Sequence, residues 1–124
     1  MIHLDTSFLI RALARNSPED RRLRAWLKEA EPLGMSTISW AEFLCGPVAA
    51  VDVELAGRIL REPVAFNSTD AALTARLFNL AGRRRGSLTD CMIAATAIRA
   101  TAALATKNHA DFRRFEPAGL RLAP

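Results

Sequence analysis

The 124-residue sequence contains no tyrosine, six phenylalanines, two cysteines and two histidines. With so few aromatic residues, we expect the core to be built from Leu, Ile, Ala and Val. Cys45 and Cys91 match neither a zinc spacing nor a redox pair, and both lie in apolar stretches, so we expect buried thiols. His3 and His109 are too isolated to form a metal pair, and His3 is expected to be structural. Zinc and thiol chemistry are therefore disfavoured.

No apolar run approaches the roughly 18 residues that a membrane span requires. The first ten residues contain Asp5 and lack a basic leader. We therefore expect no membrane span, no signal peptide and a cytoplasmic protein. The length fits one domain over residues 1–124, and a composition of 50% hydrophobic and 24% charged residues is that of a globular protein.

The formal net charge is +4, and the basic residues are unevenly distributed. One cluster is Arg83, Arg84 and Arg85, and a second contains Lys107, Arg113 and Arg114. A basic surface suits a polyanionic partner such as a nucleic acid. The alternative is a solvated face that only aids solubility.

Short apolar runs alternate with segments of helical spacing along the chain. We expect strands at residues 2–4, 35–39, 63–66 and 102–106, and a fifth at 120–122. We expect helices at residues 6–15, from Pro18, from Trp40 to Gly46, at 51–60, at 69–82 and from Ser87. This alternation predicts a three-layer α/β/α sandwich with a central parallel sheet of four to five strands.

Four acidic residues fall near the carboxyl ends of these strands. Asp5 ends the first strand, Glu42 follows the second in the first turn of a helix, Asp90 lies in the first turn of the late helix, and Asp111 follows the fourth strand. In a doubly wound parallel sheet, ligands bind beyond the carboxyl ends of the strands. We therefore expect the four side chains to converge at one edge.

Four clustered carboxylates repel one another, and without a counter-charge some would take up protons. Oxygen ligands without His or Cys favour Mg²⁺, or Mn²⁺, over zinc. Such an ion can lower the pKa of water and orient it for attack on a phosphodiester. No Ser/His/Asp or Cys/His arrangement competes with this chemistry.

Each acid also has a purely structural interpretation. Asp5 can cap the helix that follows it. Ser39-x-x-Glu42 and Ser87-x-x-Asp90 both fit the capping-box pattern, and Asp111 can stabilise a turn. The spacing alone leaves these alternatives open.

Four segments in order resemble the PIN-domain family, and specifically its VapC and FitB-like toxins. They are residues 2–10 (IHLDTSFLI), 36–43 (STISWAEF), 90–97 (DCMIAATA) and 104–112 (LATKNHADF). The resemblance covers nearly the whole chain and implies a PIN-like fold. Residues 49–67 carry no family signature, and we expect them to contribute to dimerisation or antitoxin docking.

The resemblance implies a Mg²⁺-dependent endoribonuclease that acts as the toxin of a toxin–antitoxin pair. Its expected partners are an RNA substrate, a cognate antitoxin and a second copy of the chain. Asp5, Glu42 and Asp90 match the metal-binding acids of the family, and Asp111 matches a more variable fourth acid. On this hypothesis the first three hold one Mg²⁺, and Asp111 assists a second ion or orients water.

Further residues have supporting roles in the same hypothesis. Thr6 or Ser7 would orient Asp5 or a water, with helix capping as the alternative. Thr106 and Asn108 match polar positions at the rim, with a strand-end turn as the alternative. The candidates for contacting RNA phosphates are Arg83, Arg84, Arg85 and Lys107, and the alternative is an exposed loop.

A rival interpretation is a catalytically inactive PIN-like module that binds RNA or protein. A receiver-like phosphorylation switch is disfavoured because no second acid accompanies Asp5 and the third strand lacks a phosphoacceptor Asp at its end. A Rossmann dinucleotide site is excluded because the turn after the first strand, Asp5-Thr6-Ser7, contains no glycine.

Overall fold

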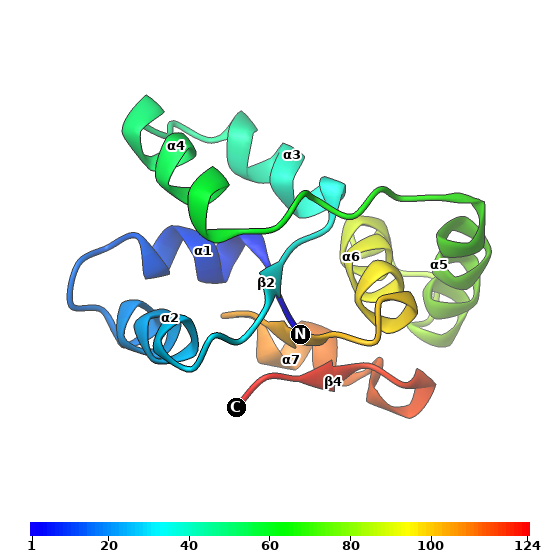
Figure 1. The fold of residues 1–124 in the computed structure, drawn as a ribbon. Coiled ribbons are helices and arrows are strands. Elements are labelled where there is room, and N and C mark those ends of the chain that lie inside the picture. The colour runs from blue at the N-terminus through cyan, green and yellow to red at the C-terminus, as the bar shows by residue number, and fades with distance from the viewer.

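The computed structural model describes residues 1–124 as four strands, seven α-helices and one 3₁₀ segment (Figure 1). The strands are β1 (Ile2–Leu4), β2 (Leu33–Gly34), β3 (Ala103–Ala105) and β4 (Arg121–Leu122). The helices are α1 (Thr6–Ala12), α2 (Pro18–Lys28), α3 (Thr37–Cys45), α4 (Ala50–Ile59), α5 (Ser68–Leu80), α6 (Leu88–Arg99) and α7 (His109–Arg113), and the 3₁₀ segment is Glu116–Ala118. None of the helices has the length and apolar character needed to cross a bilayer.

The four strands form one sheet in the order β2-β1-β3-β4, and every pair is parallel. Ile2 pairs with Leu33 on one side and with Ala103 on the other, so β1 lies at the centre. The chain moves outward from β1 to β2 and later returns to place β3 on the opposite side. The strand order therefore reverses between β1 and β3, which is where parallel sheets form ligand crevices. The predicted parallel α/β/α architecture is confirmed.

The two faces of the sheet are covered by two separate apolar clusters, because successive strand residues point to opposite faces. Leu4 and Ala105 belong to the cluster built with α1, α2, α3 and α4. Leu104 belongs to the cluster built with α5, α6 and α7. Figure 1 shows α1 and α2 on one side of the strands and α5 and α6 on the other. Each fully buried Leu or Phe contributes about 1.5–3 kcal/mol relative to the exposed side chain.

The second strand and the helix after it begin earlier than predicted. Residues 35–39 were expected as a strand, but β2 ends at Gly34 and α3 already begins at Thr37. The Ser36 side chain accepts a hydrogen bond from the backbone N–H of Ser39 and so provides the helix cap. Ser36 therefore overrides the strand preference of the β-branched residues that follow it.

The strand predicted at residues 63–66 is wrong. Only one parallel bridge, between Ser36 and Val64, forms there. The N–H of Val64 donates to the Met35 carbonyl, and the Val64 carbonyl accepts from Thr37. Pro63 has no N–H to extend the ladder, and Thr37 already belongs to a helix, so pairing stops after one residue.

Two expectations about the core also need correction. Four phenylalanines are among the largest fully buried side chains, so aromatic residues contribute more to the core than expected; they are Phe8, Phe43, Phe112 and Phe115. Cys91 is buried, but Cys45 is exposed because it lies at the outer end of α3.

His3 is structural, as predicted, and makes stability depend on pH. Its side chain is 1% exposed, and its Nε2 has no hydrogen-bond partner. Burial, followed by the positive charges of the N-terminus and Arg99, lowers the pKa of His3 to about 4. Well above pH 6.5 His3 is neutral in both the folded and the unfolded chain, so it does not change stability. As the pH falls from about 6.5 to about 4, the unfolded chain takes up a proton that the folded chain refuses, so stability is lost.

We expect this residue to reduce the free energy of unfolding by about 2 kcal/mol between pH 7 and pH 5. Urea titrations at both pH values would measure the loss, and the His3→Gln variant should lack this component. His109→Gln, which removes the other histidine, is the matched control. Equal pH dependence in wild type and His3→Gln would contradict the prediction.

Candidate active site

Asp5 is the most constrained of the four predicted acids. It lies between β1 and α1, is 4% exposed, and its backbone N–H donates to the Ala105 carbonyl of β3. Its Oδ1 accepts from the Thr6 N–H at 2.8 Å, so Asp5 caps α1 as one alternative proposed. Its Oδ2 accepts from the hydroxyls of Ser7 at 2.9 Å and Thr106 at 2.7 Å. These bonds hold the carboxylate at the β1/β3 switch point.

Glu42 is not a helix cap. It lies inside α3, because Ser36 and not Ser39 is the capping residue. Thr6 connects it to Asp5: the Thr6 hydroxyl donates to the Ser39 carbonyl at 2.7 Å and lies 3.4 Å from Glu42 Oε1. Partial burial, and then the negative charges of Asp5 and Asp90, raise the pKa of Glu42 against the opposing Thr6 contact. The capping-box explanation of this residue is therefore wrong.

Asp90 lies in the first turn of α6 without forming a capping box. Ser87 makes no side-chain cap bond, because its hydroxyl donates to the Arg84 carbonyl at 2.6 Å. Partial burial, and then the charges of Asp5 and Asp111, raise the pKa of Asp90. Arg114 opposes this rise, but its Nη2 lies 4.0 Å from Asp90 Oδ2, beyond hydrogen-bond distance.

Asp111 lies in the first turn of α7 and is exposed. It lines the same small polar pocket as Asp90. The charge couplings connect Asp90 to Asp5 and Asp111, and Glu42 to Asp5 and Asp90. The four acids thus share one electrostatic site at the carboxyl edge of the sheet.

The four acids differ from a preformed metal centre. No group of three or more His, Cys, Asp or Glu side chains lies close enough together to hold an ion in this structure. The donor chemistry nonetheless fits a hard divalent cation, since the donors are carboxylates, and burial followed by repulsion from neighbouring carboxylates raises the pKa of Glu42 and Asp90. The side chains form an acidic site, not a preassembled ligand cage.

The polar residues predicted to support the site divide into two groups. Thr6, Ser7 and Thr106 contact Asp5 directly, and the Ser7 hydroxyl also accepts from the Lys107 N–H at 3.1 Å. The Asn108 side chain makes no cap bond, and its backbone N–H donates to the Thr106 hydroxyl.

The basic residues predicted to contact RNA phosphates also fall into two groups. The Lys107 ammonium lies 3.4 Å from Glu19 Oε2, and Arg83 donates to Asn79 on α5. Lys107 therefore pairs with a carboxylate, whereas Arg83 is hydrogen-bonded to a neutral amide. Arg84 and Arg85 are exposed and line the pocket that contains Asp90 and Asp111.

One residue of the site was missed. The sequence placed Arg114 in a basic cluster without assigning it a role, yet it lines the pocket beside Asp90. The only available signal was its spacing after Asp111, one helical turn further along.

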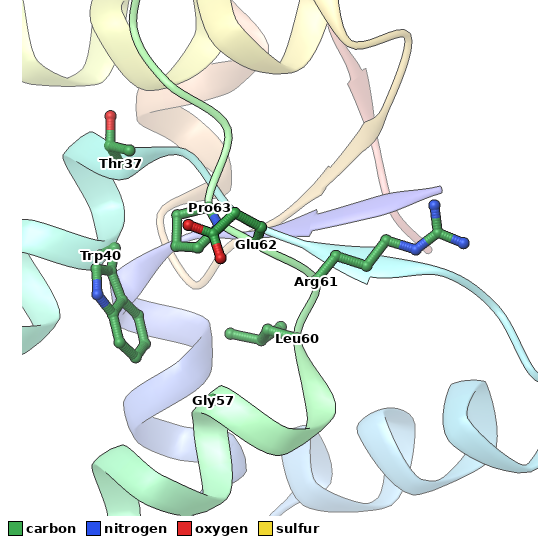
Figure 2. A pocket seen from close by; sticks show the side chains of 7 residues that line it. All are labelled: Thr37, Trp40, Gly57, Leu60, Arg61, Glu62 and Pro63. Atoms are coloured by element: carbon green, nitrogen blue, oxygen red, sulfur yellow. The ribbon is translucent and has the colours of Figure 1, made fainter.

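A second pocket, of about 410 Å³, lies away from the acids between α3 and the end of α4 (Figure 2). In this view Trp40 and Leu60 stand on facing walls, while Arg61 points away from the pocket. None of the predicted site residues lines it. Residues 49–67, which carry no family signature, supply α4 and one wall of this pocket.

Comparison with solved structures identifies the fold. VapBC2 from Rickettsia felis bound to a promoter DNA fragment shares 22% identity over 99% of this chain and 98% of that chain, with a TM-score of 0.76. DNA-bound VapBC from Salmonella typhimurium shares 20% identity over 98% and 96%, with a TM-score of 0.74. FitAcB from Neisseria gonorrhoeae shares 24% identity over 100% and 97%, with a TM-score of 0.69.

At these identities the likeness concerns the fold alone. No curated protein sequence matches the chain. The model of the PIN domain family, however, matches residues 2–116, which is nearly the whole chain. The chain therefore belongs to the PIN domain family.

Proposed function

We propose that this protein is a metal-dependent endoribonuclease and the toxin component of a toxin–antitoxin pair. The observation that carries the proposal is the acidic site at the β1/β3 switch point. Partial burial and then the neighbouring carboxylates raise the pKa of Glu42 and Asp90, and the one cation paired with the site, Arg114, lies 4.0 Å from Asp90 without a hydrogen bond. Such a site favours binding of a divalent cation.

In this proposal Asp5, Glu42 and Asp90 hold Mg²⁺ or Mn²⁺, and Asp111 assists from α7. When bound, the cation supplies Lewis-acid activation of water and offsets charge that develops on the phosphate. Carboxylate-only donors favour these ions over zinc. Binding would require the carboxylates to draw closer together than they stand in this structure.

The chain's own residues then have distinct roles. Thr106, Ser7 and the Thr6 N–H fix the orientation of the Asp5 carboxylate. Asp90 supplies a carboxylate to the site from the first turn of α6. Exposed Asp111, in the same pocket, is placed to orient water.

The direct test is cleavage of a single-stranded RNA with Mg²⁺, compared with the same reaction containing a chelator. We expect fragments with 5′-phosphate and 3′-hydroxyl ends only when Mg²⁺ is free. Calorimetric titration with Mg²⁺ separates this function from the rival, an inactive RNA- or protein-binding module. Saturable Mg²⁺ binding without cleavage, or no Mg²⁺ binding, would contradict the nuclease proposal.

Glu42→Gln should reduce cleavage roughly 10–100-fold or more, because even residues that only support metal ligands have effects of this size. Stability should change by less than about 0.5 kcal/mol, since Glu42 caps no helix and its one side-chain hydrogen bond is a long contact of 3.4 Å with Thr6 that glutamine can also make. Single-turnover cleavage and thermal unfolding would measure the two effects. Glu62→Gln, an exposed acid outside the site, is the matched control. Full activity in Glu42→Gln would remove Glu42 from the proposed ligand set.

The antitoxin partner is proposed from solved structures of the same fold, one of which is a toxin–antitoxin complex from Klebsiella pneumoniae. An apolar groove between α1, α2 and α4 supports such a partner. Leu27 and Leu55 line it and remain 42% and 45% exposed. We propose that an amphipathic segment of the antitoxin covers this groove. A homodimer is proposed only by analogy with the family.

A further inference from the structure

A small polar pocket adjoins the acidic site and shares Asp90 and Asp111 with it. It has a volume of about 180 Å³ and lies between the loop before α6 and the end of α7. No hydrophobic residue lines it. Its walls are Arg84, Arg85, Gly86, Ser87, Asp90, Asp111 and Arg114. The lining includes three arginines and two aspartates, so its cationic groups outnumber its anionic ones.

The Arg114 guanidinium packs on Phe115 and forms an ion pair with Asp90, but it makes no hydrogen bond to a protein acceptor. Its carbon lies 5.0 Å from the centre of the Phe115 ring, and the side chain is 21% exposed. Its Nη2 lies 4.0 Å from Asp90 Oδ2, too far for a hydrogen bond. Its buried Nε has no partner either. An arginine packed in this way retains N–H donors for an incoming acceptor.

The loop before α6 leaves the first turn of that helix without a side-chain cap. Gly86 has a φ of +84°, a conformation that favours glycine, and it turns the chain into α6. The Ser87 hydroxyl is committed to the Arg84 carbonyl, so no side chain caps the first turn of α6. The positive end of the helix dipole therefore adds to the charge of Arg84 and Arg85 at the pocket rim.

We propose that this pocket binds a phosphodiester group of the RNA strand next to the one that is cut, and that Arg114 is its anchor. Guanidinium groups form paired, charge-assisted hydrogen bonds with phosphate oxygens. A phosphate also matches the size and fully polar lining of the pocket. The inference rests on the proposed function, because it requires an RNA strand across the acidic site.

The test is fluorescence anisotropy of a 5′-fluorescein-labelled single-stranded oligoribonucleotide, titrated in chelator so that the strand stays intact. Arg114→Gln should weaken binding roughly tenfold. It should also reduce the slope of log affinity against log salt by about 0.7, the value for one phosphate contact on a single strand. Arg113→Gln is the matched control, because Arg113 is 69% exposed and lies 3.8 Å from Glu116, outside the pocket. It should weaken binding less than about threefold.

The double variant Arg84→Gln/Arg85→Gln keeps the proposal testable if Arg114→Gln fails to fold. Both of its side chains are exposed in a loop, so their replacement should not disturb the fold. It should weaken binding at least as much as Arg114→Gln. If Arg114→Gln or the double variant binds like Arg113→Gln, the pocket proposal is overturned while the nuclease proposal stands. If Arg114→Gln loses binding as expected but wild type never cuts RNA with Mg²⁺, the pocket stands and the nuclease proposal fails. A wild type that binds no RNA in chelator overturns the pocket proposal, while cleavage with Mg²⁺ still decides the nuclease proposal.

Discussion

Asp5→Asn should reduce RNA cleavage by more than about 100-fold, because even residues that only orient a metal ligand are worth 10–100-fold. Asp5 accepts three hydrogen bonds and lies where the strand order reverses. Asparagine keeps the size and one acceptor oxygen, so α1 should remain capped. Cleavage should be measured under single-turnover conditions, with circular dichroism to show that the variant is folded.

A substitution at Thr106 tests the same site through a residue that contacts the Asp5 carboxylate. Its hydroxyl donates to Asp5 Oδ2 and accepts from the Asn108 N–H, and the residue is 1% exposed. Thr106→Val should lose activity by about 10–100-fold, less than Asp5→Asn, and Thr106→Ser should restore it because the hydroxyl returns. Equal activity of the valine and serine variants would show that the hydroxyl does not position Asp5. An active Asp5→Asn protein would end the proposal that this site carries the chemistry.

Arg99→Leu should lower the free energy of unfolding by about 3 kcal/mol or more, the cost of leaving a buried carboxylate without its partner. Arg99, at the end of α6, donates through Nε and Nη2 to both oxygens of Asp70, and a second Nη2 bond reaches the Ala65 carbonyl. The Asp70 side chain is fully buried and also closes the capping box of α5 with Asn67. One arginine therefore connects α5, α6 and the segment before α5.

Urea unfolding would measure this loss, and the double variant Asp70→Asn/Arg99→Leu provides the diagnostic comparison. It removes the charge as well as its partner, so it should be more stable than Arg99→Leu alone. Arg58→Leu is the matched control, because the Arg58–Glu54 pair is 71% and 64% exposed and should cost less than about 1 kcal/mol. Equal losses for Arg99→Leu and Arg58→Leu would show that burial of Asp70 carries no such penalty.

Both predictions concern contacts between residues that are distant in the sequence. Thr106 and Asp5 are 101 positions apart, and Arg99 and Asp70 are 29 apart. Neither contact could be inferred from periodicity, because spacing within one helix or strand describes neighbours only. Similarly, the sequence could not show that Lys107 pairs with Glu19, or that Arg114 lies beside Asp90.

Boundaries of elements were predictable where a local signal stood alone. Ser17 and Pro18 marked the start of α2, and the Ser17 side chain accepts from the Asp20 N–H as expected. At α3 two serines were possible capping residues. The sequence pattern favoured Ser39, but Ser36 caps the helix. The choice between them depends on where β2 leaves the sheet, which is a tertiary property.

By itself, the sequence determined the alternation of strands and helices, because the spacing of apolar residues is a local pattern. It also determined that four acids follow or lie near those strands, because their order along the chain can be read directly; they are Asp5, Glu42, Asp90 and Asp111. Only the tertiary structure decided which acids cap helices and which cations are already paired. It also decided that Arg84, Arg85 and Arg114 line a pocket next to the acids. These features depend on how distant segments pack together and on how far each charged group is desolvated, and no local pattern contains that information.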